Sequence, residues 1–236
     1  MKRLLKSLVA RWWSALRRGV AVEEVEPAAG YALWAASYPA QAHNVLMAVE
    51  EKAMLSLFPD LNGKTCLDLG CGSGRYLQRM KEAGAGALTG LDLSPEMLVR
   101  AEQLPFPVSL HLGRFDALPF ENQCFDFICC GLGLGHEPQL AAALVEIARV
   151  LRPGGLFLYS DVHPFGTLAG WKRSFRQARR EISIRQYLYL YSDHHRAVEQ
   201  AGLHVTRVLE PLGGPGAPEA FQTVPVALVI AAVKPS

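Results

Sequence analysis

Short apolar runs alternate with amphipathic stretches from about residue 64 to residue 233. Runs of this length, separated by helical patterns, are typical of βαβ units and of a parallel sheet that is covered on both faces. The pattern therefore predicts an α/β fold. The predicted strands are 65–69, 87–92, 108–112, 125–130, 156–160, 203–209 and 224–233.

Helical periodicity and breaker residues predict the segments between these strands. The expected helices are 40–57, 75–83, one that opens at Pro95 with Ser94 as its N-cap, 138–151 and 192–201. Arg-Pro-Gly-Gly at 152–155 predicts a helix stop and a tight turn. Residues 163–190 show no clear period, and the Gly/Pro-rich stretch 211–218 is typical of a loop.

Residues 2–18 predict an amphipathic helix with leucine and tryptophan on one half of its wheel and basic residues on the other. Such a helix suits an anionic membrane surface, an acidic carrier protein or the chain's own domain, and the sequence leaves these three open. Lys6 and Arg11 interrupt the apolar run, which argues against a signal peptide. We expect a cytoplasmic protein, and peripheral contact at the inner membrane surface is one of the roles that this helix would suit.

Charge is concentrated in two segments of a chain of 236 residues. The formal net charge of +2 gives no argument for a nucleic-acid partner. However, residues 1–22 and 171–185 together hold half of the 24 basic residues and only one acid, Glu181. For residues 165–190, which contain the second of these segments, the alternatives are a solvated helix face or a cap that attracts an anionic substrate.

Five cysteines occur without a CxxC pair, at positions 66, 71, 124, 129 and 130. Most lie in the predicted strands, so we expect buried free thiols. A structural zinc site needs ligand pairs at short spacing, and no metal site is predicted.

The residues that indicate function form a glycine-rich turn between a strand and a helix, Cys-Leu-Asp-Leu-Gly-Cys-Gly-Ser-Gly at 66–74. Asp92 lies at the end of the next strand, where a carboxylate can accept hydrogen bonds from both hydroxyls of a ribose. The dinucleotide pattern GxGxxG fails because residue 75 is Arg, and no phosphate-binding GxxxxGK motif is present. Asp68 lies just before the turn, where an acid favours a cationic ligand over a pyrophosphate.

This turn resembles motif I of the class I S-adenosylmethionine-dependent methyltransferases, type 11 group. The segments 88–92, 113–120, 125–131 and 149–156 resemble further family motifs, in the family's order. The resemblance implies a Rossmann-like three-layer sandwich: a mostly parallel seven-stranded sheet with an antiparallel last strand, plus N-terminal helices. It divides the chain into a basic helix at 1–22, a helical lid at 23–60 and a methyltransferase domain at 61–236, with a substrate cap inserted at about 163–191.

The resemblance also implies that S-adenosyl-L-methionine is the cofactor, and it gives roles to individual residues. Asp68 would lie near the amino group of the cofactor's methionine part and Asp92 would bind the ribose. Tyr31-Ala-Leu-Trp-Ala-Ala-Ser-Tyr38 resembles the YxxWAxxY lid of small-molecule methyltransferases. The remaining expected cofactor-binding residues are Gly70, Gly72 and Gly74 at the methionine part, Leu93, Asp116 and Ala117 at the adenine, Gly131 at the methyl-donor end, and Tyr38 of the lid.

The residues after the fourth strand constrain the acceptor. Methyltransferases of nucleic-acid amines commonly carry an Asp/Asn-Pro-Pro-Tyr/Phe tetrad there, whereas this chain has Gly-Leu-Gly-Leu-Gly-His at 131–136. We therefore expect an O- or C-acceptor that is a small molecule or is carrier-bound, anionic or lipophilic. The layout is similar to malonyl-carrier-protein and quinone-ring methyltransferases.

Histidines near the expected substrate edge are the candidates for a catalytic base. His136 and His163 are favoured because they come after the fourth and fifth strands, and His43, His194 and His195 are weaker candidates. Two alternatives to a soluble small-molecule enzyme stay open: a non-catalytic S-adenosylmethionine-binding protein of the same fold, and a membrane-associated quinone or lipid methyltransferase.

Overall fold

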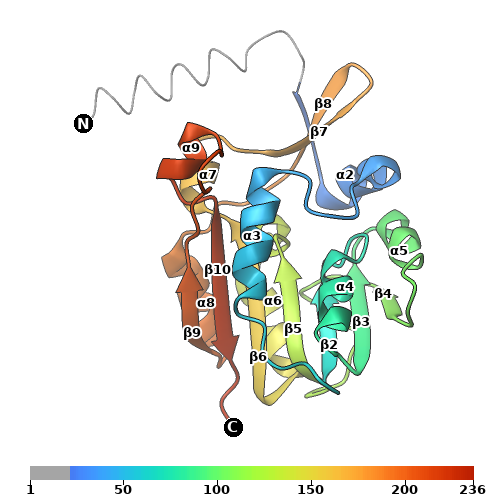
Figure 1. The fold of residues 1–236 in the computed structure, drawn as a ribbon. Coiled ribbons are helices and arrows are strands. Elements are labelled where there is room, and N and C mark those ends of the chain that lie inside the picture. The colour runs from blue at the N-terminus through green and yellow to red at the C-terminus, as the bar shows by residue number, and fades with distance from the viewer. Residues whose placement is uncertain (1–21) are drawn as a thin grey trace.

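The computed structural model describes residues 22–236 and centres on a seven-stranded sheet of order β4-β3-β2-β5-β6-β10-β9 (Figure 1). Neighbouring strands are parallel except for β10, which runs antiparallel to β6 and β9. This confirms the predicted fold class. The strands are β2 (Thr65–Leu69), β3 (Ala87–Asp92), β4 (Ser109–Leu112), β5 (Phe125–Gly131), β6 (Leu151–Val162), β9 (His204–Leu209) and β10 (Ala227–Val233).

Helices cover both faces of this sheet and bury two hydrophobic clusters, one on each side. Helices α3 (Val45–Leu55) and α4 (Arg75–Glu82) cover one face, and α6 (Leu140–Val150) and α8 (Tyr191–Gln200) cover the other. Strands β5 and β10 are apolar almost throughout because both of their faces are buried. The other helical elements are α2 (Pro27–Trp34), η1 (Ala35–Ser37), α5 (Pro95–Ala101), η2 (Leu134–His136), α7 (Pro164–Leu168) and α9 (Glu219–Thr223).

Local signals place most helix ends correctly. The side chain of Ser94 accepts a hydrogen bond from the amide of Met97 and caps α5, as predicted. Asn44 caps α3 in the same way, so this helix begins at Val45, a few residues later than expected. The turn predicted at 152–155 is instead a bulge inside β6, with Gly154 in the left-handed region at φ 74°.

Within the segment 163–190, for which the sequence shows no period, the short helix α7 is followed by a hairpin and not by a helix face. Strands β7 (Arg173–Gln177) and β8 (Arg180–Ile184) pair antiparallel, and β1 (Val22–Val25) adds to β8 in parallel. Phe175, Ile182 and Ile184 form a small buried cluster on one side of this three-stranded sheet, while Arg176 and Arg180 are exposed. The solvated-helix alternative is therefore wrong for these residues, because they pair as two strands of a hairpin.

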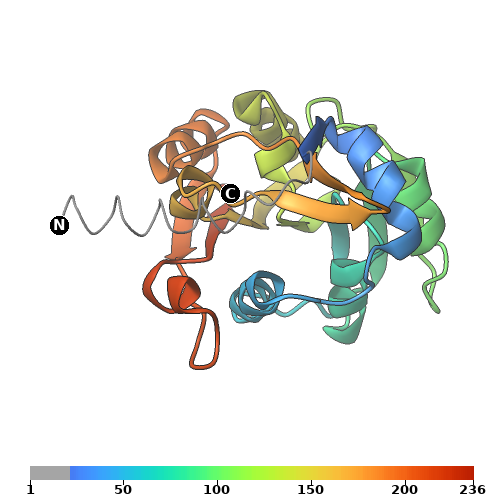
Figure 2. The ribbon, with the colours of Figure 1, turned by 90° about the horizontal axis from the view of Figure 1, so that it is seen from above.

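The hairpin lies beside α2 over the carboxyl ends of the parallel strands (Figure 2). The expected lid at 23–60 and the expected cap at 163–191 thus meet in one small sheet. The predicted helix at 2–18 and the boundary of the segment 1–22 lie outside the described residues, and the domain limits stay predictions. Within 22–236, no helix combines the length and apolarity that crossing a bilayer needs.

The cysteines are free, as expected. Cys66, Cys71, Cys129 and Cys130 are buried, and burial raises the pKa of each thiol. Cys124 is partly exposed. The four buried thiols are therefore packing residues of the core.

Candidate active site

The glycine turn lies between the end of β2 and the start of α4, and its backbone takes a conformation that only glycine adopts freely. Gly70, Gly72 and Gly74 have φ values of 69°, 55° and 91°. The amides of Gly70 and Cys71 donate to the carbonyl of Leu91 on β3, at 2.8 and 3.0 Å, and hold the turn against the sheet. The turn is therefore fixed before any ligand arrives.

The three glycines differ in what surrounds them. A Cβ at Gly72 would meet nothing within 4 Å, so this glycine faces open space that a ligand can approach. A Cβ at Gly74 would lie 2.6 Å from Cδ1 of Leu104, so packing adds to the positive φ in favouring glycine there. A Cβ at Gly70 would lie 3.2 Å from the ring of Phe115, which the sequence analysis missed as a neighbour of the turn.

Asp92 is the acid at the end of β3, and it is linked to the turn. Its Oδ2 accepts from the amide of Gly72 at 2.8 Å, and its Oδ1 accepts from the amide of Ser94 at 2.9 Å. Each carboxylate oxygen can accept a second hydrogen bond, which leaves capacity for two hydroxyl groups. The next residue, Leu93, is 40% exposed, which is unusual for an apolar side chain beside a buried acid.

Asp68 is buried, and neither of its carboxylate oxygens has a hydrogen-bond partner among the described residues. Burial raises its pKa from 3.8 to about 7. The hydroxyl of Ser73, in the same turn, is also buried without a partner in the part of the chain that is described. Unsatisfied buried polar atoms of this kind indicate that a polar, cationic ligand belongs here.

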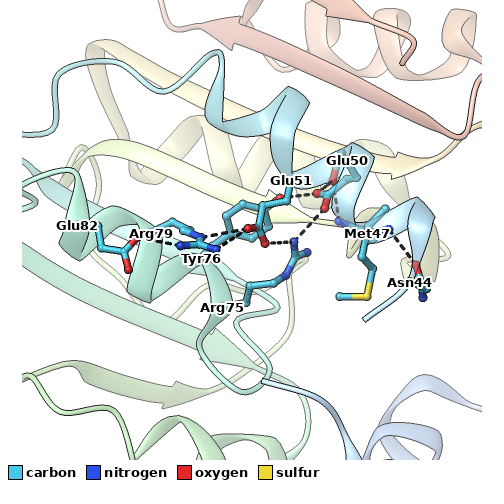
Figure 3. Close-up of polar contacts among 10 residues, drawn as sticks. Asn44, Met47, Glu50, Glu51, Arg75, Tyr76, Arg79 and Glu82 are labelled. Atoms are coloured by element: carbon cyan, nitrogen blue, oxygen red, sulfur yellow. Dashed lines mark hydrogen bonds and ion pairs between the residues drawn. The ribbon is translucent and has the colours of Figure 1, made fainter. Parts of the chain in front are cut away.

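Helix α3 is locked to the start of α4 by buried charges (Figure 3). Glu50 is 0% exposed and accepts from Tyr76 Oη at 2.6 Å, from Ser160 Oγ at 2.6 Å and from Arg75 Nη1 at 3.1 Å. Glu51 accepts from Arg75 and from Arg79. This network joins α3 to Arg75, the residue directly after the glycine turn, a link that the sequence analysis missed.

The predicted adenine segment lies after β4, where the amide of Gly113 donates to the carbonyl of Asp92 at 3.0 Å. Both oxygens of Asp116 accept from Arg114, at 2.8 Å each, and this pair lowers the pKa of Asp116. Ala117 is the next residue of the same loop. The adenine contact of these two residues stays a prediction.

Gly131 ends β5, and a Cβ there would lie 2.1 Å from the ring of Tyr76. The structure thus gives a packing reason for this glycine. Its predicted place at the methyl-donor end is untested.

His136 is held by two hydrogen bonds. Its Nδ1 lies 2.6 Å from the carbonyl oxygen of Arg185, which can only accept, so Nδ1 carries the proton. Its Nε2 therefore accepts from Tyr31 Oη, at 2.9 Å. Burial lowers the pKa of His136 to about 3, so the ring stays neutral and serves to orient Tyr31.

His163 is also engaged at both nitrogens. It caps α7, with Nδ1 accepting from the amide of Phe165, and its Nε2 lies 3.1 Å from Glu210. Of the weaker candidates, His43 lines an apolar cavity beside the lid, and His194 is buried near Tyr159. A catalytic role for His136 or His163 stays a prediction, and the observed contacts favour a positioning role.

The lid and the cap, together with Val162 of β6 and Phe221 of α9, line this open cavity, which has a volume of about 570 Å³. Trp34 stacks on Phe175, with ring centroids 4.8 Å apart, and Tyr38 packs edge-on against Trp34. Most of the wall is apolar, and it also includes Lys172 and Arg173. The main apolar contributors are Val22, Trp34, Leu46, Met47, Val162, Ala169, Trp171 and Phe221.

Comparison with known proteins agrees with this geometry. A family model described as a methyltransferase domain matches residues 67–159. The chain is 30% identical over 200 residues, covering 78% of this chain and 74% of the relative, to the Mycobacterium ulcerans protein named "Probable phthiotriol/phenolphthiotriol dimycocerosates methyltransferase 2". A solved S-adenosylmethionine dependent methyltransferase from Mesorhizobium loti shares the fold with a TM-score of 0.68 and 23% identity, over 81% of this chain and 100% of that one.

Shorter matches involve other acceptors. The malonyl-(acyl-carrier protein) O-methyltransferase of Erwinia billingiae is 40% identical over 42% of this chain and 39% of its own length. The demethylmenaquinone methyltransferase of Staphylococcus haemolyticus is 41% identical over 41% of this chain and 42% of its own length. In these two cases the chain spans less than half of the relative.

The chain is thus a class I S-adenosylmethionine-dependent methyltransferase. Within that class it belongs to the type 11 methyltransferase family. The cofactor is S-adenosylmethionine, and the residues present fit it. The carboxylate of Asp68, which has no hydrogen-bond partner within 22–236, suits an ammonium group. The open approach at Gly72, together with the acceptor capacity left on Asp92, suits the adjoining ribose.

Proposed function

We propose that the chain methylates a predominantly apolar small-molecule or carrier-bound acceptor at oxygen or carbon. The observation that carries the proposal is the apolar cavity of about 570 Å³, which is lined by residues of the lid, of the cap and of the end of β6. The cap hairpin and α2 of the lid lie over the carboxyl ends of the parallel strands, the edge that also bears the glycine turn (Figure 2). Ligand sites in open α/β sheets lie at this edge. A cavity of this size and lining suits an acceptor with a ring or an alkyl chain.

The relatives' names support the acceptor class without identifying the molecule. One names a lipid, phthiotriol or phenolphthiotriol dimycocerosates, another demethylmenaquinone and a third a malonyl group on an acyl-carrier protein. The first two acceptors are lipophilic. The third matches the carrier-bound alternative.

The cofactor supplies an activated methyl group on a sulfonium, so the chain's own residues have to position the acceptor and exclude water. Asp68, Gly72 and Asp92 would hold the cofactor, with Leu93 against the adenine. Trp34 and Tyr38 of the lid would close over the acceptor, because both line the cavity and pack together.

The experiment measures S-adenosylhomocysteine release by the full chain with matched acceptor panels: alkylphenols, quinols, medium-chain carboxylates and malonyl-carrier protein. Turnover with an apolar acceptor is the expected result. Val162 lines the cavity, so Val162→Phe is expected to abolish turnover while S-adenosylhomocysteine binding persists. Val145→Phe is the control, because Val145 is 54% exposed on α6.

Turnover that is restricted to polar acceptors, or that is equal in the Val162→Phe and Val145→Phe variants, would contradict the proposal. Binding of the cofactor without turnover on the whole panel would favour the non-catalytic alternative.

A further inference from the structure

Arg173 is a cation in the cavity wall that lacks an ion-pair partner among residues 22–236. Its guanidinium makes one hydrogen bond to a described residue, from Nη1 to Tyr31 Oη at 2.8 Å. No carboxylate among residues 22–236 lies within 4.0 Å of it, and residues 1–21 contain neither Asp nor Glu. Its Nε and Nη2 have no hydrogen-bond partner in the described part of the chain.

Three other basic residues of the cap have acidic partners, and Arg176 and Arg179 are exposed to solvent. Arg180 pairs with Glu23, and Arg185 pairs with Glu24 and Glu26, all on the exposed surface. Lys172, also in the cavity wall, lies 4.0 Å from Glu24. Removing a charge from water without a partner is costly, so an inward-facing guanidinium that lacks a partner indicates an anionic ligand.

The acidic residues around the cavity do not neutralise Arg173. Glu181 lines the cavity, but its Oε1 accepts from Ser174 Oγ at 2.8 Å. Asp161 is buried at the end of β6, where its Oδ1 accepts from the amide of Val162. Asp161 interacts with Arg173 only through its longer-range field, because the two are not within ion-pair distance. Neither carboxylate therefore forms an ion pair with the guanidinium of Arg173.

Tyr31 and His136 fix the direction in which Arg173 can bind. The Tyr31 hydroxyl donates its proton to His136 Nε2, so its oxygen presents a lone pair to Arg173 Nη1. His136 is in turn anchored on the carbonyl of Arg185, at the end of the hairpin. This chain of hydrogen bonds holds Nη1 of the guanidinium in place and leaves Nε and Nη2 available to donate to a ligand.

We propose that Arg173 is the anion-binding residue of the acceptor site, so that the acceptor is an amphipathic anion. Its apolar body occupies the cavity, and an ionised oxygen of a carboxylate, phenolate or enolate lies on the guanidinium. This rests on the proposed function, since it defines the acceptor of the same site. An oxygen that is already ionised needs no general base, which agrees with two candidate histidines whose nitrogens are all engaged.

The test uses 4-butylbenzoate and 4-butylbenzamide, which have the same apolar body but differ in charge. Isothermal titration calorimetry at pH 8 measures their binding to the full chain saturated with S-adenosylhomocysteine. We expect the benzoate to bind at least about tenfold more tightly than the benzamide. Arg173→Met is expected to remove this preference by weakening the benzoate alone, and Arg173→Lys to retain part of it.

Arg176→Met is the matched control, because Arg176 lies on the same strand but its side chain is exposed. Its preference for the benzoate should equal that of the unmodified chain. An unchanged S-adenosylhomocysteine thermal shift in each variant verifies that the fold is retained. If Arg173→Met fails this criterion, Tyr31→Phe replaces it, with a partial loss of preference expected because Arg173 then loses its anchor.

Equal affinities for the two probes, absence of binding by both, or a preference that survives in Arg173→Met would overturn the proposal. Because the readout is binding, these outcomes leave methyl transfer to an uncharged apolar acceptor untouched. Conversely, absence of turnover on the acceptor panel would contradict the proposed function, whereas the binding preference for the benzoate tests Arg173 separately.

Discussion

The backbone amide of Gly72 donates a 2.8 Å hydrogen bond to Oδ2 of Asp92, at the end of the neighbouring strand β3. Two segments that are 20 residues apart in the chain thereby form one rigid edge. The remaining lone pairs of Asp92 point away from these amide bonds and are the acceptors that a ribose needs. The cofactor site is thus organised before the cofactor binds.

Asp92→Ala should weaken S-adenosylhomocysteine binding by about a hundredfold or more, because hydrogen bonds to a charged group are lost and Gly72 loses its anchor. Titration calorimetry measures this. Asp126→Ala is the control, since Asp126 also accepts from a backbone amide, that of Thr65, but at the start of β2. Equal affinities in the two variants would show that Asp92 does not bind the ribose.

The buried carboxylate of Asp68 should make cofactor affinity depend on pH. Its pKa is raised from 3.8 to about 7, so below pH 7 the unliganded protein holds a proton that a ligand ammonium group would displace. S-adenosylhomocysteine affinity should therefore rise about tenfold between pH 6 and pH 8. Asp68→Asn should bind weakly with a flat profile.

Asp161→Asn is the control for this pH dependence. Burial raises the pKa of Asp161 to about 7 as well, but it lies on β6, two strands away from Asp68. In the Asp161→Asn variant, S-adenosylhomocysteine affinity should rise with pH as steeply as in the unmodified chain. A slope that disappears in Asp161→Asn and persists in Asp68→Asn would refute the assignment of Asp68.

Glu50→Ala should lower the free energy of unfolding by about 3–5 kcal/mol, because it removes one partner of a buried ion pair and strands Tyr76 Oη and Ser160 Oγ (Figure 3). Denaturant unfolding followed by circular dichroism gives this value. Glu82→Ala, which removes a half-exposed partner of Arg79, should cost less than about 1 kcal/mol. Similar losses in both variants would mean that the α3–α4 network is not a stabilising link.

Gly131→Ala should destabilise the protein by about 1–3 kcal/mol, since its Cβ would lie 2.1 Å from the Tyr76 ring. Thermal unfolding measures the change. Gly214→Ala should be close to neutral, because nothing lies within 4 Å of a Cβ there. A neutral Gly131→Ala would show that the ring moves freely, and the predicted role of Gly131 beside the cofactor would become its main constraint.

The sequence predicts the sheet and the cofactor edge well, because both depend on local signals. The apolar runs at 65–69 and 125–130 and the glycine turn carry their own pattern, and the structure has them where expected. The cap is predicted poorly. Its two strands show no alternation of buried and exposed residues, and its pairing with β1 joins residues far apart in the chain.

The acceptor side depends on such long-range contacts. Tyr31, His136 and Arg173 come from three separate segments, and only the folded chain brings them into one hydrogen-bonded series. The sequence marks His136 as a candidate base, but it cannot show that both nitrogens are occupied. Likewise, Glu50 has the pattern of an ordinary helix residue until its burial against Arg75 is seen.

A crystal structure of the full chain grown with S-adenosylhomocysteine tests the central claim most directly. We predict density along Gly70–Gly74, with the ribose hydroxyls on Asp92, the amino group beside Asp68 and the sulfur directed at the cavity of Trp34 and Arg173. Density for the ligand at any other place, or a sulfur that faces away from that cavity, would contradict the account.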